Sequence, residues 1–158
     1  MGNAAESDFS TKIDLKKVIH FVEKHLKNPH FAIGIADNIG YYTANEGYLR
    51  GDSNGKTFFL GCRAGLSTIG IDSVGNVRGC ESMYDETFIE GNLRGKSLCD
   101  IWNAPNAFSY NRQFTANQLS GICSTCKYGT KCAGGCRSYN YFSHTKLYES
   151  PCCICNTK

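Results

Sequence analysis

The first regular pattern in the chain is an apolar face that repeats at helical spacing over residues 14–28. Lysine and glutamate occupy the opposite face, and the apolar positions are Leu15, Val18, Ile19, Val22 and Leu26. This spacing predicts an amphipathic helix. Asp14 can cap its start, and Pro29 ends it because proline pushes the preceding residue out of the helical region.

A short apolar run follows at residues 31–36. Turn-forming residues bound the run on both sides, so it predicts a buried strand. A polar, tyrosine-containing loop is expected over residues 37–46, and a glycine-rich stretch with a turn at residues 52–55 comes after it. Helix and strand together predict an α/β layer in this part of the chain.

A hairpin pattern opens the second part of the chain. Residues 68–72 and 76–80 are strand-like, and the short segment between them ends in Gly75. This arrangement predicts a β-hairpin whose turn uses Gly75 for positive φ. The hairpin carries Cys80 back toward Cys62.

Two more helices are expected after the hairpin. Residues 97–102 predict a short helix, and residues 135–148 predict an aromatic-rich one whose end is marked by Pro151. The side chains that we expect the first of these helices to bury are Leu98, Ile101 and Trp102.

Charge and hydropathy exclude two classes of partner. The 158 residues include 17 basic and 14 acidic ones, for a net charge of +3, without a Lys/Arg-rich run or a repeating basic–aromatic pattern. Nucleic acid is therefore not an expected partner. No window approaches the ~20 apolar residues that span a bilayer, and the N-terminus lacks a signal-like apolar core. We expect a cytoplasmic protein without membrane contact.

Cysteine spacing changes the picture most. The array is Cys62-x12-Gly75-x4-Cys80, then Cys123-x2-Cys126-x5-Cys132-x3-Cys136, then Cys152, Cys153 and Cys155. Dense cysteines in a reducing compartment are metal ligands more often than disulfides. Residues 133–135 add backbone amides that can hydrogen-bond thiolate or sulfide. The number of cysteines alone leaves both zinc and iron–sulfur clusters open.

This array, with Gly91-Asn92-Leu93 and residues 97–102 in its first gap, resembles the SPASM domain. That domain is the C-terminal, auxiliary iron–sulfur extension of many radical S-adenosylmethionine enzymes of peptide maturation. The resemblance divides the chain into residues 1–60 and residues 61–158. It implies an α+β fold class: a small cysteine-rich iron–sulfur domain with a β-hairpin and short helices, after an α/β segment that resembles the end of a partial TIM barrel.

The resemblance also implies two 4Fe-4S clusters with interleaved ligands. The ligands of the first are Cys62, Cys80 and Cys136. The ligands of the second are Cys123, Cys126, Cys132 and Cys153, with Cys152 and Cys155 as alternatives for the last position. The fourth ligand of the first cluster stays open, and it is either an exchangeable position or Cys99.

The implied function is electron transfer and substrate positioning in the modification of a peptide or protein. The parent enzymes hold their radical-generating cluster with Cys-x3-Cys-x2-Cys, which this sequence lacks. We therefore expect an auxiliary domain or fragment that is not catalytic alone, with S-adenosylmethionine bound only by a separate core domain or protein. Candidates to contact an acidic or carboxylate group are Arg78, Arg94 and Arg137, with ordinary solvated arginines as the alternative. The alternative is a zinc-binding structural or protein-interaction module.

Overall fold

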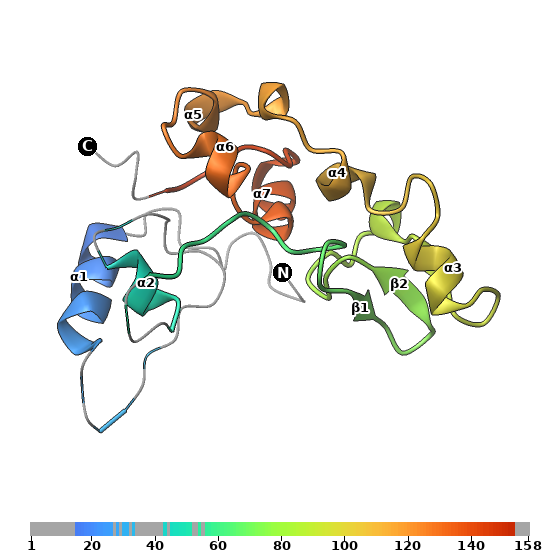
Figure 1. Ribbon diagram of the computed structural model, residues 1–158, viewed down its shortest axis with the longest axis horizontal. Helices are drawn as coiled ribbons and strands as arrows, with labels where there is room; N and C mark the ends of the chain where they lie inside the picture. Colours follow the sequence, from blue (N-terminus) through green and yellow to red (C-terminus); the bar gives the residue numbers. More distant parts are fainter. Residues whose placement is uncertain are drawn as a thin grey trace.

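The computed structural model describes residues 15–26, 28, 30, 31, 33, 43, 45–51, 54 and 56–153. Helices α1 (Leu15–His25) and α2 (Glu46–Leu49) lie at one end of the long axis. Strands β1 (Gly70–Ile71) and β2 (Asn76–Arg78) lie at the other end. Between the two ends gather helices α5 (Gly121–Ser124), α6 (Gly129–Cys132) and α7 (Arg137–His144) (Figure 1).

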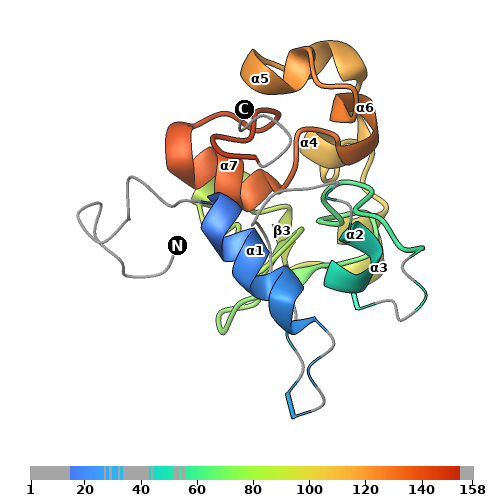
Figure 2. The ribbon, with the colours of Figure 1, turned by 90° about the vertical axis from the view of Figure 1, so that its left-hand side faces the viewer.

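Helix α1 confirms the predicted amphipathic helix, although it ends at His25. Ile19 and Val22 are buried, while lysines on the opposite face are exposed. The predicted cap, Asp14, lies outside the described residues. In the view from that end, α1 and α2 stand apart from each other (Figure 2). No helix of the described residues has the length and apolar character needed to cross a bilayer.

Most of the segment predicted to form the strand of the α/β layer lies outside the described residues, so the structure tests little of that prediction. Within residues 31–36 the structure describes only Phe31 and Ile33, neither of them in a strand, and the rest lies outside the described residues. The strand and the barrel-like layer stay predictions. Helix α2 begins where the sequence predicted a loop to end. Its buried Glu46 accepts hydrogen bonds from Arg50 Nε (3.0 Å) and the Phe59 amide (3.2 Å), which hold this single turn in place.

The predicted hairpin is confirmed and is part of a larger sheet. Strands β1, β2 and β3 (Gly91–Asn92) form an antiparallel sheet in that order, with Ile71 opposite Val77 and Val77 opposite Gly91. Gly75 turns the chain at φ +90°. The third strand was not predicted. It lies so close to helix α3 (Leu98–Trp102) that a Cβ on Gly91 would stand 2.8 Å from Ile101.

Within the part of the chain that the structure describes, the core includes two small clusters. The first is formed by Val77, Ile101, Ala107 and Phe108. The second is formed by Ala64, Met83 and Phe88, the last of these in the 3-10 turn η2 (Glu86–Phe88). The predicted α3 is confirmed and buries Ile101, and Trp102 is half-buried, but Leu98 is 39 % exposed. That expectation was wrong because so short a helix lays only one face on the core.

The remaining elements are short. They are α4 (Ser109–Arg112), η3 (Ala116–Gln118), α5 (Gly121–Ser124), α6 (Gly129–Cys132) and α7 (Arg137–His144). The helix predicted over residues 135–148 is thus shorter at both ends. It stops at Thr145, which has φ +61° and donates its amide to Tyr141 O at 2.7 Å. Pro151 therefore does not end it.

Candidate metal centre

The cysteines of the described residues are all free of disulfides, and they differ in exposure. Cys123, Cys132 and Cys153 are buried, whereas Cys99 is exposed on α3. Partly buried are Cys62, Cys80, Cys126, Cys136 and Cys152. Cys155 lies outside the described residues.

Helices α5 and α6 and the C-terminal segment bring Cys123, Cys126, Cys132 and Cys153 together; we call these four the C-terminal cysteine group. Burial raises the pKa of the Cys132 thiol to about 11, and the charges of Cys123, Cys153 and Cys126 add to the rise. Burial likewise raises the pKa of Cys123, with the charges of Cys153 and Cys126 adding to it. Cys123 and Cys132 therefore each lie within electrostatic reach of the other three sulfurs.

Backbone amides point at these sulfurs. Ser150 donates its amide to Cys123 Sγ at 3.3 Å, and the Gly134 amide hydrogen-bonds Cys132 and opposes the rise of its pKa. The hydrogen bond from the Gly134 amide confirms the amide–sulfur contact predicted from the glycines between Cys132 and Cys136. Such hydrogen bonds stabilise electron density on sulfur.

The turn between Cys132 and Cys136 depends on its small residues. Ala133, Gly134 and Gly135 all have positive φ, at 52°, 75° and 91°. A Cβ on Gly134 would also stand 2.6 Å from the carbonyl oxygen of Tyr148. The turn therefore needs glycine both for its backbone conformation and for this close approach.

The hairpin places Cys62 and Cys80 together, as predicted. Both side chains pack against the core cluster of Ala64, Met83 and Phe88. Gly65 donates its amide to Gly79 O at 3.2 Å and so joins the two cysteine-bearing segments. We call Cys62 and Cys80 the hairpin cysteine pair.

Cys136 and Arg137 connect the two sets of cysteines. Cys136 is the extended N-cap residue of α7, and Arg137 begins the helix with no exposed surface. Burial lowers the pKa of Arg137, whereas the charges of Cys62, Cys132 and Cys136 raise it. One buried guanidinium therefore interacts with cysteines of both sets. Its burial also shows that the expected contact of Arg137 with a substrate group was wrong.

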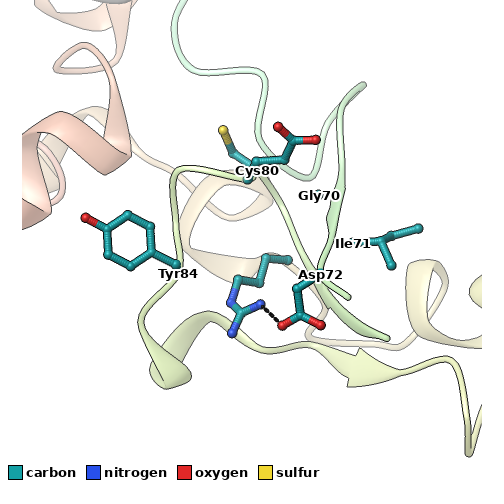
Figure 3. Close-up of a pocket in the computed structure, with 7 residues that line it drawn as sticks. Gly70, Ile71, Asp72, Cys80 and Tyr84 are labelled. Atoms are coloured by element: carbon teal, nitrogen blue, oxygen red, sulfur yellow. Dashed lines mark hydrogen bonds and ion pairs between the residues drawn. The ribbon is translucent and has the colours of Figure 1, made fainter. Parts of the chain in front are cut away.

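A pocket of about 350 Å³ opens beside Cys80. Figure 3 shows Cys80 across from the ion pair in which Arg78 Nη1 donates to Asp72 Oδ2 at 2.7 Å. This hydrogen bond holds the pKa of Asp72 far below its usual range. Arg78 is only 8 % exposed. The remaining arginine candidate, Arg94, is exposed and donates Nε to Val74 O at 3.1 Å.

The donor set fits an iron–sulfur cluster better than a single zinc ion. Among the described residues, no three His, Cys, Asp or Glu side chains converge closely enough to hold one metal ion. A structural zinc needs four donors at about 2.0–2.3 Å from one point, whereas an iron–sulfur cluster presents several irons to several thiolates. Thiols from several segments that interact electrostatically are compatible with the second arrangement.

Several supporting residues were missed by the sequence reasoning. Buried Asn111 on α4 donates Nδ2 to Cys62 O (2.7 Å) and Ala64 O (2.8 Å). Tyr148 OH donates to Tyr110 O at 2.9 Å and ties the C-terminal segment to α4. A polar residue on a one-turn helix leaves no periodic signal, so nothing in the sequence identified these contacts.

Comparison with known proteins gives one family and one kind of relative. Residues 62–127 match the SPASM model, described as an iron–sulfur cluster-binding domain. Mycofactocin maturase MftC of Mycobacterium ulcerans is 31 % identical over 87 residues, which are 54 % of this chain and 23 % of the relative. MftC of Mycobacterium tuberculosis is 30 % identical over 87 residues, 54 % of this chain and 22 % of its own length. The chain thus aligns with less than a quarter of these curated relatives. Residues 62–127 are thus similar to the SPASM iron–sulfur cluster-binding domains.

Proposed function

We propose that this chain holds two auxiliary 4Fe-4S clusters for electron transfer and substrate positioning in a radical S-adenosylmethionine enzyme that modifies a peptide. The observation that carries the proposal is the C-terminal cysteine group, in which buried thiols from three separate segments lie within electrostatic reach. The SPASM match and the similarity to mycofactocin maturases support the same function.

The two clusters take separate ligands. We assign Cys62, Cys80 and Cys136 to the first cluster, and the C-terminal cysteine group to the second. Cys153 is preferred to Cys152 because it is buried and its charge affects both Cys123 and Cys132. Cys152 has a pKa raised by burial and by the charge of Cys153.

The chain's own residues prepare the sites. A bound iron–sulfur cluster supplies one-electron transfer, with a potential that depends on charge, hydrogen bonding and solvent exposure. Burial of Cys123, Cys132 and Cys153 keeps water away from the second site. The Gly134 and Ser150 amides donate to its sulfurs.

The first cluster has an open fourth position in this proposal. Cys99, the other candidate, is exposed on α3, and its Sγ accepts a hydrogen bond from Asn103 Nδ2 at 3.3 Å. The pocket beside Cys80 offers space for an exchangeable ligand or a substrate side chain. Substrate would approach between Cys80 and the Asp72–Arg78 pair.

The S-adenosylmethionine-binding core belongs to a separate domain or protein in this proposal. We divide the chain into residues 1–60, which would contribute to the wall of that core, and residues 61–158, which would carry the clusters. The separation of α1 and α2 from the hairpin along the long axis supports the division (Figure 1).

Anaerobic reconstitution with iron and sulfide tests the proposal. We expect about eight irons per chain and a broad visible charge-transfer band. Cys126→Ser and Cys80→Ser should each remove about half of the iron, and a double variant should remove both halves. Cys99→Ser is the matched control and should keep all of it. A colourless chain that binds one or two zinc ions would contradict the proposal.

A further inference from the structure

Arg137 is a buried cation with unused hydrogen-bond donors. It has no exposed surface, and its Nη1 donates to Ala133 O (2.5 Å), Leu147 O (3.2 Å) and, at longer range, Gly135 O (3.4 Å). Nε and Nη2 have no hydrogen-bond partner among the described residues. No carboxylate in the same part of the chain forms an ion pair with it.

Two aromatic rings lie close to this guanidinium. Its central carbon lies 4.5 Å from the centre of the Tyr148 ring and 5.3 Å from that of Phe114. Rings stabilise a cation through its face, whereas the N–H donors of arginine lie in its plane. The N–H groups of Nε and Nη2, which lie at the edge of the guanidinium, therefore remain available to a hydrogen-bond acceptor other than the rings.

Leaving such donors unsatisfied is unfavourable in a protein interior. A buried guanidinium stays protonated, so it also needs negative charge nearby. Besides Tyr148, the groups whose negative charge would favour protonated Arg137 are Cys62 and Cys136, assigned above to the first cluster, and Cys132, assigned to the second. Arg137 is thus electrostatically coupled to both sets of ligands.

We propose that Arg137 is a positioning residue shared by the two clusters, serving both as their buried counter-charge and, through Nε–H and Nη2–H, as a hydrogen-bond donor to their sulfurs. This inference rests on the proposed function. Positive charge and hydrogen bonds to sulfur favour the reduced, more negative state of a cluster. Arg137 therefore raises the reduction potentials of both clusters together.

Three variants separate charge, shape and general packing. Arg137→Gln removes the charge but keeps amide donors, and Arg137→Lys keeps the charge but loses the planar fork. Arg112→Gln is the matched control, because Arg112 also stacks on two rings, Trp102 (4.4 Å) and Phe108 (4.7 Å), and donates to backbone carbonyls.

The readouts are iron content and the midpoint potentials of both clusters, from redox titration followed by electron paramagnetic resonance. In Arg137→Gln we expect the equilibrium constant for one-electron reduction to fall about tenfold at each cluster, or about 59 mV. In Arg137→Lys the potentials should stay close to the wild-type values, because the charge is kept. Arg112→Gln should cause no shift. A fully loaded Arg137→Gln chain with unchanged potentials, or with only one potential shifted, overturns the inference.

A second measurement starts from the wild-type chain and therefore does not depend on whether Arg137→Gln folds. The wild-type chain is loaded after labelling arginine with guanidino-¹⁵N, and pulsed electron paramagnetic resonance measures the nitrogen coupling to the reduced clusters. We expect coupling in wild type and in Arg112→Lys, and none in Arg137→Lys. A loaded wild-type chain without coupling overturns this inference alone, whereas a wild-type chain that takes up no iron overturns the proposed function and the inference with it.

Discussion

Single residues around Cys132 decide whether the C-terminal cysteine group can form. The thiol is 7 % exposed and burial raises its pKa to about 11, so in the metal-free chain it is almost entirely protonated near neutral pH. The Gly134 amide opposes this rise, as it would for any negative charge on the sulfur. The sequence predicted the amide from the glycines, but not the burial.

The reactivity of Cys132 in the metal-free chain follows from its pKa. At pH 8 about one thiol in a thousand is a thiolate, since each pH unit below the pKa lowers that fraction about tenfold. We expect alkylation of Cys132 to be at least about a hundredfold slower than alkylation of exposed Cys99, and to accelerate as the pH rises toward 11. Peptide mass spectrometry after timed alkylation measures both. Similar rates at the two sites would contradict the burial of Cys132.

Gly134→Ala tests the turn that positions Cys132 and Cys136. Gly134 has φ +75°, and a Cβ there would stand 2.6 Å from Tyr148 O. The matched control is Gly51→Ala, which has nearly the same φ, +78°, but nothing within 4 Å of the added Cβ. The left-handed conformation costs about 1–2 kcal/mol in either case. Chemical unfolding should show a larger loss for Gly134→Ala, and equal losses would mean that the turn tolerates the methyl group.

Elements with a local signal were predicted well, and elements without one were not. Helix α1 has a long apolar period, the β1–β2 hairpin has a turn glycine, and α3 has Ser97 as a capping residue that accepts the Asp100 amide at 3.1 Å. Strand β3 pairs only two residues, and α4, α5 and α6 are four residues each. Such short elements are stabilised by tertiary contacts, which periodicity does not record.

The hairpin turn should lose stability in acid through Asp72. Its carboxylate accepts the Val74 and Asn76 amides at 3.1 and 2.9 Å, besides the bond from Arg78. The bond from Arg78 lowers the pKa of Asp72 most. A carboxyl with a lowered folded-state pKa contributes stability above its unfolded value of about 4 and loses that contribution as pH falls below it. We expect the wild type to be destabilised between pH 4 and pH 2 more than Asp72→Asn is. Equal pH dependence of the unfolding free energy would contradict this.

At the scale of the whole molecule, the cysteine order led to a candidate site whose ligand assignment stays a prediction, whereas the patterning predicted only part of the fold. Spacing indicated which cysteines approach one another because metal ligands must converge. It could not indicate that Arg137 is fully buried beside Cys136, nor that Asn111 and Tyr148 tie α4 to Cys62 and to the C-terminal segment. Those contacts join residues far apart in the chain, so they exist only once the molecule has folded.

Removal of the metal should therefore unfold the molecule unevenly. The hairpin end has its own apolar cluster of Val77, Ile101, Ala107 and Phe108. The C-terminal end has one-turn helices around buried cysteines, so metal ligation would supply stability that apolar contacts do not.

We expect hydrogen exchange after chelation to accelerate in α5, α6 and the segment up to Cys153, while β2, α3 and α1 keep most of their protection. Cys126→Ser should reproduce this pattern in a reconstituted chain, and Cys99→Ser should not. Uniform loss of protection along the chain would instead mean that the two ends fold as one cooperative unit, and unchanged protection would mean that the cysteines are not structural ligands.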